Sequence, residues 1–107
     1  MDGLWQTLAA GRVSVVLSGH DHLYERFAPL AADGTADPRD GVRSFTVGTG
    51  GADPDRRPLW TRRHSERLIA DRWGVLKLEL ADDAYRWSFL DTTGEVLDSG
   101  QSRCRDR

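Results

Sequence analysis

The order of apolar and polar positions at the start of the chain predicts a helix followed by a strand. Residues 4–10 are good helix formers with apolar side chains at helical spacing, and Gly11 is a typical stop signal. Residues 13–17 are short, β-branched and almost wholly apolar, which is typical of a strand buried on both faces. The polar loop 18–22 follows this strand. This order is an α/β unit, and such units place their sites beyond the carboxyl ends of strands.

After this unit the pattern changes to β structure. Strands are predicted at residues 24–30, 43–47, 73–80, 85–89 and 95–98. The segments 73–80 and 85–89 alternate every two residues and predict a hairpin. A long arginine-rich loop is predicted from about residue 52 to 71, and a frayed tail from about 101 to 107. The predicted fold is α/β, and mostly β after one N-terminal helix.

The apolar strand at residues 13–17 also predicts that these elements are part of a larger domain. A strand buried on both faces needs sheet neighbours on both sides and a layer over each face. The preceding sequence provides one short helix. We therefore expect residues 1–107 to be the C-terminal part of a domain whose other strands lie upstream.

Composition and charge exclude several classes of function. The net charge of −2 gives no overall attraction to nucleic acid or to an anionic membrane surface. No apolar run approaches the roughly 20 residues that span a bilayer. The first residues do not form a signal peptide, and localisation stays open. A single cysteine, Cys104, cannot form an internal disulfide.

The candidate chemistry lies in the loop after the first strand, where His20 and His22 flank Asp21. Residues two apart in an extended segment point the same way, and imidazole nitrogens bind divalent metals. The two histidines can bind one ion or one each of a pair. Gly19 allows a sharp turn beside them, and Asp21 can orient an imidazole. The alternative is an ordinary solvated surface loop.

The block Val-Val-Leu-Ser-Gly-His-Asp-His-Leu-Tyr-Glu-Arg-Phe at residues 15–27 resembles the final conserved block of calcineurin-like metallophosphoesterases. It is closest to the branch of purple acid phosphatases and bacterial alkaline phosphatase-like enzymes. The strand and glycine-rich loop at residues 45–51 are similar to the next segment of that family. The resemblance covers about residues 4–104. It implies a fragment of an αββα sandwich.

The resemblance implies a metal-dependent hydrolase of phosphate esters with two adjacent ions, commonly iron, zinc or manganese. His20 and His22 would each donate a nitrogen, one to each ion. The family's other ligands, its bridging carboxylate and its acid histidine belong to earlier blocks that this sequence lacks. No catalytic residue is therefore assigned here, and the chain by itself is expected to be inactive, because two neutral imidazoles do not complete a dinuclear site.

Four residues are expected around the histidines, as supports of the metal loop or as the rim of the substrate site: Asp21, Tyr24, Glu25 and Arg26. Glu25 and Arg26 form either an ion pair that supports the loop or ordinary strand polarity. Tyr24 is expected to pack with its hydroxyl near solvent. The glycines at residues 48–51 predict a turn near the site more than a phosphate cradle, and the arginines of the 52–71 loop favour a solvated loop over a phosphate-attracting rim.

Two other functions are compatible with the sequence. The chain is alternatively a stand-alone β-rich binding module, with vestigial histidines or a structural metal, and it can self-associate through exposed sheet edges. A second alternative is a different metal-dependent hydrolase in which His20 and His22 are the first ligand pair. The second is disfavoured, because His64 and scattered acids are the available downstream ligands.

Overall fold

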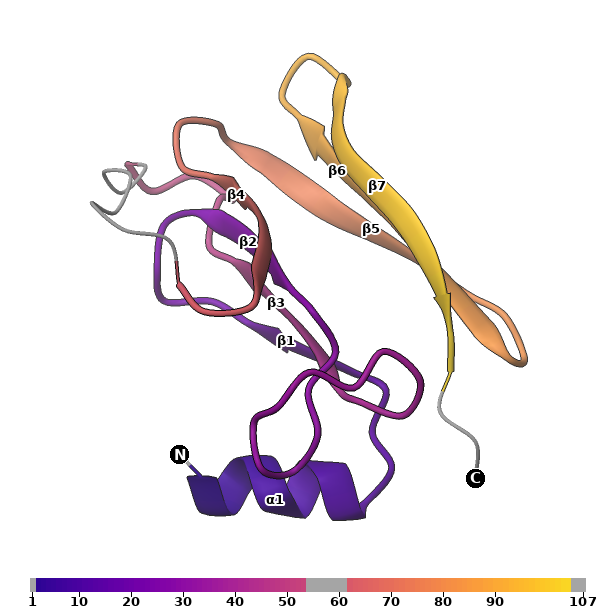
Figure 1. The fold of residues 1–107 in the computed structure, drawn as a ribbon. Coiled ribbons are helices and arrows are strands. Elements are labelled where there is room, and N and C mark those ends of the chain that lie inside the picture. Colours follow the sequence, from indigo (N-terminus) through magenta and orange to yellow (C-terminus); the bar gives the residue numbers. More distant parts are fainter. Residues whose placement is uncertain (1, 54–61, 105–107) are drawn as a thin grey trace.

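The computed structural model describes residues 2–53 and 62–104, and this part of the chain is mostly β (Figure 1). Its helix is α1 (Asp2–Ala10). Its strands are β1 (Val15–Ser18), β2 (Tyr24–Phe27), β3 (Arg43–Val47), β4 (Ser65–Ile69), β5 (Gly74–Leu80), β6 (Ala84–Asp91) and β7 (Val96–Arg103). They form a four-stranded sheet in the order β1-β3-β2-β4 and a three-stranded sheet in the order β5-β6-β7. The prediction of one N-terminal helix followed by β structure is confirmed.

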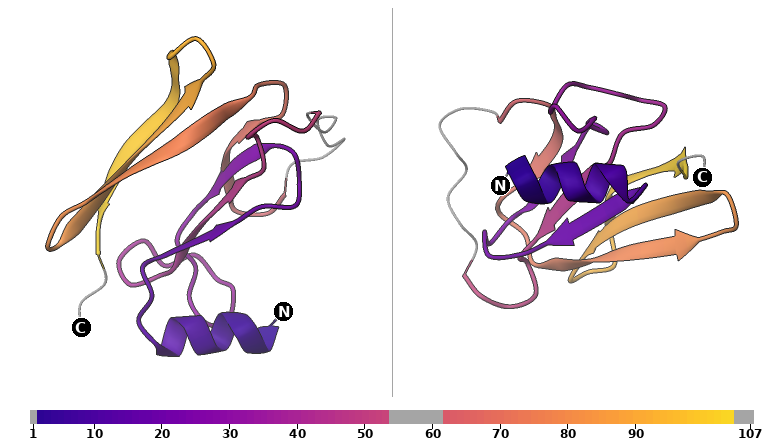
Figure 2. Two further views of the ribbon diagram at one scale, coloured as in Figure 1. Left: turned by 180° about the vertical axis from the view of Figure 1, so that it is seen from behind. Right: turned by 90° about the horizontal axis from the view of Figure 1, so that it is seen from below.

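The helix α1 lies on the side of the four-stranded sheet that faces away from the three-stranded sheet (Figure 2). A groove of about 690 Å³ separates α1 from this sheet, and Trp5 and Phe27 are among its lining residues. The indole Nε1 of Trp5 donates a hydrogen bond of 3.0 Å to the carbonyl of Ala31, which ties the helix to the loop after β2. None of the helices in the described part of the chain has the length and apolarity needed to span a membrane.

The first strand occupies an edge of its sheet. Within the described residues, β1 pairs only with β3, in parallel, with Val16 opposite Ser44 and Ser18 opposite Thr46. Val15 packs against the core, whereas Leu17 is 54% exposed. The prediction of a strand buried on both faces is therefore wrong for its C-terminal half, because no described element covers Leu17 or pairs with the outer edge of β1.

The strand β4 lies inside the segment 52–71 that the sequence predicts as a loop. It pairs antiparallel with β2, with Tyr24 opposite Ile69 and Arg26 opposite Arg67. The side chain of Ile69 is buried, which anchors this edge of the sheet. The strand has five residues and few apolar positions, and its order depends on pairing with β2 more than on its own pattern. Residues 54–61 of the predicted loop lie outside the described residues.

The three-stranded sheet confirms the predicted hairpin. β5 and β6 pair antiparallel, and Leu76 opposite Phe89 and Leu78 opposite Trp87 place both leucines against the core. β7 is longer than the predicted segment 95–98 and continues to Arg103. The prediction that the chain frays from about residue 101 is wrong for residues 101–103, because they pair with the start of β6.

Aromatic side chains fill the space between the two sheets. Tyr24 of β2 stacks on Phe89 of β6 with ring centroids 4.3 Å apart, and Phe45 of β3 meets Trp87 edge-on at 5.6 Å. A Cβ added at Gly100 would lie 2.3 Å from the Trp87 ring. A glycine at this position of β7 therefore allows Trp87 to lie across the neighbouring strand.

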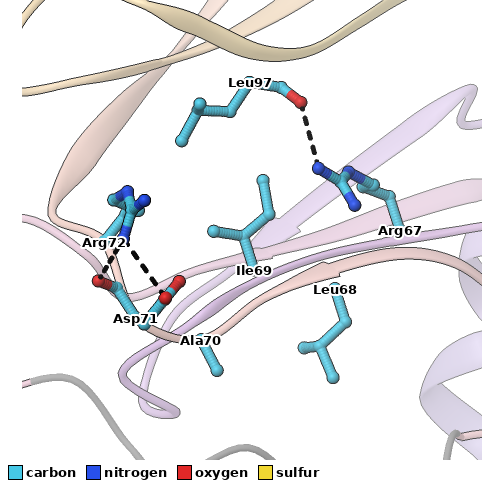
Figure 3. Close-up of a pocket in the computed structure, with 7 residues that line it drawn as sticks. All are labelled: Arg67, Leu68, Ile69, Ala70, Asp71, Arg72 and Leu97. Atoms are coloured by element: carbon cyan, nitrogen blue, oxygen red, sulfur yellow. Dashed lines mark hydrogen bonds and ion pairs between the residues drawn. The ribbon is translucent and has the colours of Figure 1, made fainter.

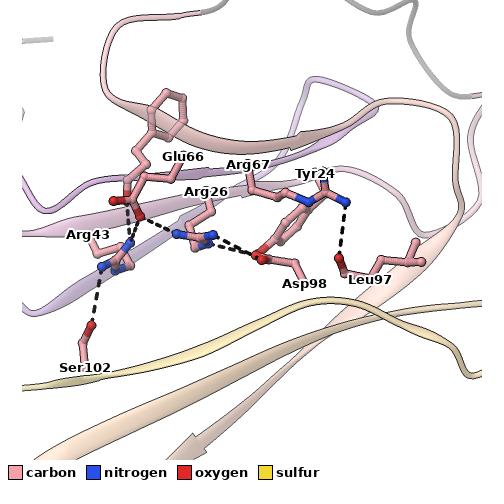
Figure 4. A network of polar contacts seen from close by, with 9 residues as sticks. Tyr24, Arg26, Arg43, Glu66, Arg67, Leu97, Asp98 and Ser102 are labelled. Carbon is pink, nitrogen blue, oxygen red and sulfur yellow. Dashed lines mark hydrogen bonds and ion pairs between the residues drawn. The ribbon is translucent and has the colours of Figure 1, made fainter.

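Charged side chains join the two sheets beside this aromatic core (Figure 4). The Arg26 guanidinium of β2 donates to both carboxylate oxygens of Asp98 on β7, at 2.9 and 3.2 Å. The Tyr24 hydroxyl donates to the same carboxylate. Arg26 also pairs with Glu66 of β4. Asp98 is thus bound by two residues of the opposite sheet, and its side chain is 8% exposed.

A second arginine extends this network along β3. Arg43 donates to Glu66 at 2.6 Å and to the Ser102 hydroxyl of β7 at 3.4 Å. Its guanidinium carbon lies 4.7 Å from the centre of the Trp87 ring, which is within cation–π distance. Glu66 therefore lies between two arginines, and the network reaches from β4 across β2 and β3 to β7.

This network predicts how stability depends on pH. Burial tends to raise the pKa of Asp98, but the hydrogen bonds from Arg26 and Tyr24 and the charge of Arg26 outweigh it and hold the pKa below its usual value. A carboxylate with a depressed folded-state pKa stabilises the fold fully above its unfolded pKa of about 3.9. That contribution is lost as the pH falls from about 5 through the folded pKa.

We expect Asp98→Asn to lower the free energy of unfolding at pH 7 by about 2 kcal/mol and to flatten its dependence on pH below about 5. Urea unfolding between pH 7 and pH 3 measures both effects. The exposed Asp82→Asn is the matched control and leaves both unchanged. If the free energy of unfolding of Asp98→Asn falls with pH in parallel with that of the wild type below about pH 5, Asp98 is not the source of the acid sensitivity.

Candidate metal centre

The loop that carries the two histidines lies at the carboxyl end of β1, beside the loop that follows β3. Because β1 and β3 run parallel, the segments after Ser18 and after Val47 leave the sheet at the same edge. Gly48 packs directly beneath the histidine loop, since a Cβ added to it would lie 2.0 Å from the Asp21 carbonyl oxygen. The Gly48 amide also donates to the Leu23 carbonyl at 3.0 Å. The two loops therefore support each other through main-chain contacts.

The rest of the glycine-rich loop is joined to the second sheet. The Thr49 hydroxyl donates to the Gly74 carbonyl at 2.9 Å, and the Gly74 amide donates back to the Thr49 carbonyl at 3.0 Å. The Trp73 indole donates to the Ala52 carbonyl at 2.6 Å. This segment therefore connects the histidine loop to the start of β5.

His20 adopts an unusual backbone conformation. Its φ angle of 78° lies in the left-handed region, which residues other than glycine adopt at a cost of about 1 kcal/mol or more. Such a conformation persists when surrounding contacts determine it. The His20 side chain is exposed and is therefore accessible for coordination.

The ring of His22 contacts a backbone carbonyl. Its Nδ1 lies 2.9 Å from the carbonyl oxygen of Asp53. A carbonyl oxygen accepts hydrogen bonds only, so the proton of a neutral His22 ring is on Nδ1 and the in-plane lone pair is on Nε2. Histidines that bind metals are oriented by the same device, in which the other ring N–H binds a carboxylate or a backbone carbonyl. The Asp53 carbonyl is therefore an acceptor that fixes the orientation of the His22 ring.

Asp21 in the histidine loop and Glu25 in β2 both contact the same arginine. Arg62 donates to Asp21 Oδ2 at 3.1 Å, and its Nε lies 3.8 Å from Glu25 Oε1. The Glu25 side chain is 1% exposed. Both of its oxygens lack a hydrogen-bond partner in the described part of the structure.

Tyr24 and Arg26 point toward the other sheet, away from Glu25. Strand geometry alternates successive side chains between faces, and the contacts of both residues with Asp98 place them between the sheets. The Tyr24 hydroxyl was expected near solvent, but it is buried against Asp98. Burial and the neighbouring carboxylate raise the pKa of the phenol. The ion pair considered between Glu25 and Arg26 is not formed, because Arg26 pairs with Asp98 and Glu66.

The sequence did not single out Arg62 or the Asp53 carbonyl as parts of this site. Arg62 belongs to an arginine-rich stretch that suggested a solvated loop, and no local pattern distinguishes it from Arg63 beside it. A backbone carbonyl carries no sequence signal at all. His64, in the same stretch, has a φ of 66°, and its carbonyl accepts a hydrogen bond of 2.8 Å from the Ala28 amide. Trp60, in the same arginine-rich stretch, lies outside the described residues.

The donor set fits part of a metal centre. His20 and His22 have the chemistry of metal ligands, but no group of three or more His, Cys, Asp or Glu side chains in the described ranges is arranged to bind an ion. Two neutral imidazoles leave most of a coordination sphere and all of its compensating charge unsupplied. We therefore derive no catalytic step from these residues alone.

A separate cavity of about 290 Å³ lies along β4, away from the histidines (Figure 3). Arg67 on its wall donates to the Leu97 carbonyl at 3.4 Å, and Arg72 is paired with the Asp71 carboxylate at 3.2 Å. Both cations are bound to groups of the protein. The cavity includes neither His20 nor His22 and offers no ligand to the candidate centre.

Comparison with known proteins gives one solved structure of similar fold. The chain superposes on part of a purple acid phosphatase from yellow lupin (Lupinus luteus) seeds with a TM-score of 0.83 over 96% of its length. The likeness is one of fold. Sequence identity is 22%, and the match covers 19% of the phosphatase chain. No protein-family model and no curated protein matches the sequence.

The close packing of Gly48 under Asp21 gives a direct test of how the loop is held. We expect Gly48→Ala to lower the free energy of unfolding by about 2–3 kcal/mol, because the added methyl group cannot fit beneath the Asp21 carbonyl. It should also shift the imidazole NMR signals of His20 and His22. Gly50→Ala is the matched control, since nothing lies within 4 Å of its added Cβ. Equal effects of the two substitutions would refute the described packing.

Proposed function

We propose that this chain contributes the last histidine pair of a dinuclear metal site in a phosphoric-ester hydrolase. The hydrogen bond between His22 Nδ1 and the Asp53 carbonyl carries this proposal, because metal-binding histidines are commonly oriented by such a contact of their other ring nitrogen. The location of the loop beyond the carboxyl ends of two parallel strands, where α/β sheets place their sites, supports it further. The fold shared with part of a plant purple acid phosphatase is consistent with the same function.

In this proposal His20 and His22 each bind one ion of the pair, and iron, zinc and manganese all suit imidazole ligands. Bound ions would supply Lewis-acid activation of water and charge neutralisation on a phosphate-ester substrate. The residues of this chain would bind and orient. His22 would be held in one tautomer by Asp53, and Asp21 would hold the loop through Arg62.

The remaining ligands must come from residues outside the described part of this chain. Acidic groups are needed, because two adjacent metal ions require anionic ligands to balance their charge. We propose that the helix and two sheets belong to an αββα sandwich, within which further strands bring these acids to the same edge. The activity and the phosphate-ester substrate belong to that complete assembly.

The open edge of β1 favours a second candidate function, that of an interaction module. Leu17 on β1 and Leu4 on α1 are 54% and 55% exposed. An unpaired strand edge with apolar side chains is a template for strand addition. A second copy of the chain is one occupant that would pair with it.

The interaction module makes a specific prediction. If β1 pairs with a second copy of the chain, light scattering gives a molecular mass that rises with protein concentration to that of a dimer. Leu17→Lys would return the mass to that of the monomer. Leu80→Lys is the control, because Leu80 is 78% exposed at the far end of the β5–β6 hairpin. A monomer at all concentrations excludes self-association through this edge.

The hydrolase proposal predicts weak metal binding without turnover. We expect calorimetry to give a dissociation constant for Zn²⁺ of about 1 μM or weaker, because the candidate ligands in the described ranges are two neutral imidazoles. His20→Ala and His22→Ala should each abolish this binding, whereas His64→Ala should leave it unchanged. The chain should not hydrolyse p-nitrophenyl phosphate with manganese, zinc or iron. Turnover that disappears in His20→Ala would show that the site is complete after all.

A further inference from the structure

A buried carboxylate lies behind the histidine loop without a full set of partners. Glu25 is 1% exposed and sits in β2 between Thr46 of β3 and Leu68 of β4. Neither of its oxygens has a hydrogen-bond partner in the part of the chain that the structure describes. Placing an ionised carboxylate in such a site is unfavourable unless a nearby positive charge compensates it. The cation that compensates the Glu25 carboxylate is therefore needed for the stability of this part of the sheet.

In the described part of the chain, the cation that pairs with Glu25 is the guanidinium of Arg62. Its Nε lies 3.8 Å from Glu25 Oε1, and its Nη2 donates to Asp21 Oδ2 at 3.1 Å. Nε and the outer nitrogen lie along one edge of a rigid planar group, so a single side chain can span two carboxylates with fixed geometry. One of these carboxylates is buried and the other is 35% exposed. Arg62 is thus a bridge from the interior of the sheet to the surface loop.

The surface end of the bridge lies between the two candidate ligands. Asp21 follows His20, whose φ of 78° requires contacts that stabilise it. Gly48 supports the main chain of Asp21 from one side, and Arg62 binds its side chain from the other. These two contacts hold Asp21, which lies between the two histidines, while the Asp53 carbonyl contacts the ring of His22.

We propose that Arg62 is a positioning residue for the metal ligands, acting through Asp21 and held in place by Glu25. The effect of Arg62 on metal binding rests on the proposed function, but its effect on the conformation of the loop does not. Arg62 touches neither substrate nor metal in this proposal. It fixes the arrangement of residues 19–22 from outside the coordination sphere.

The experiment compares Arg62→Gln with Arg63→Gln, which removes the same charge from the adjacent, exposed residue. Two readouts are used at a temperature at which both variants are folded: Zn²⁺ affinity by calorimetry, and the backbone and imidazole NMR shifts of residues 19–22 without metal. We expect Arg62→Gln to weaken Zn²⁺ binding by about 10-fold or more, as loss of outer contacts to metal ligands commonly does, and to shift the loop signals. Arg63→Gln should change the affinity less than about twofold.

A double variant separates positioning from simple stability. Arg62→Gln combined with Glu25→Gln removes both charges, so no uncompensated carboxylate stays buried, and thermal stability should recover toward the wild type. Zn²⁺ affinity should stay low, because the contact with Asp21 is still missing. Recovery of affinity together with stability would overturn the positioning role, as would equal effects of Arg62→Gln and Arg63→Gln.

The metal-free NMR readout keeps the two proposals distinct. If the wild type binds no Zn²⁺, the hydrolase proposal fails, and the loop shifts in Arg62→Gln still decide whether Arg62 holds residues 19–22. If the wild type binds Zn²⁺ through His20 and His22 but Arg62→Gln leaves both affinity and loop shifts unchanged, only the role of Arg62 is refuted.

Discussion

The period of two along β2 is the constraint on which the rest of the structure depends. Tyr24 and Arg26 point into the space between the sheets, where they bind Asp98, and Glu25 points to the opposite face. Three consecutive residues therefore serve two purposes. A shift of one residue in the register of β2 would bury the wrong side chains in both places. The aromatic core and the histidine loop are consequently fixed by the same strand.

Much of the fold was predictable, because most elements carry a local pattern. The helix, the strand at residues 43–47 and the β5–β6 hairpin all follow from apolar spacing and turn signals. β4 was missed because its short, mostly polar sequence carries no clear strand pattern, and the structure shows it paired with β2. The exposure of Leu17 could not be predicted either, because its apolar sequence is that of an interior strand and the described structure leaves it at an edge.

The candidate site was predicted in part. His20 and His22 stand out as candidate ligands because a histidine pair after an apolar strand is a local signal. Their supports come from residues far away along the chain. Asp53 contributes a backbone atom, and Arg62 is one arginine among several. The same limit applies to Glu25. Strand alternation argues against a pair with Arg26, because adjacent strand residues face opposite sides. The observed partner, Arg62, lies far away along the chain and carries no local signal.

The acceptor for the His22 ring is a main-chain atom, which has a consequence for how this segment tolerates sequence drift. Every amino acid has a carbonyl oxygen, so no single replacement at position 53 deletes the acceptor. What the ring orientation does require is the path of the backbone that brings this peptide group to the histidine. Insertions or deletions between the glycine-rich turn and residue 53 are therefore expected to be far more damaging than exchanges of side chains there.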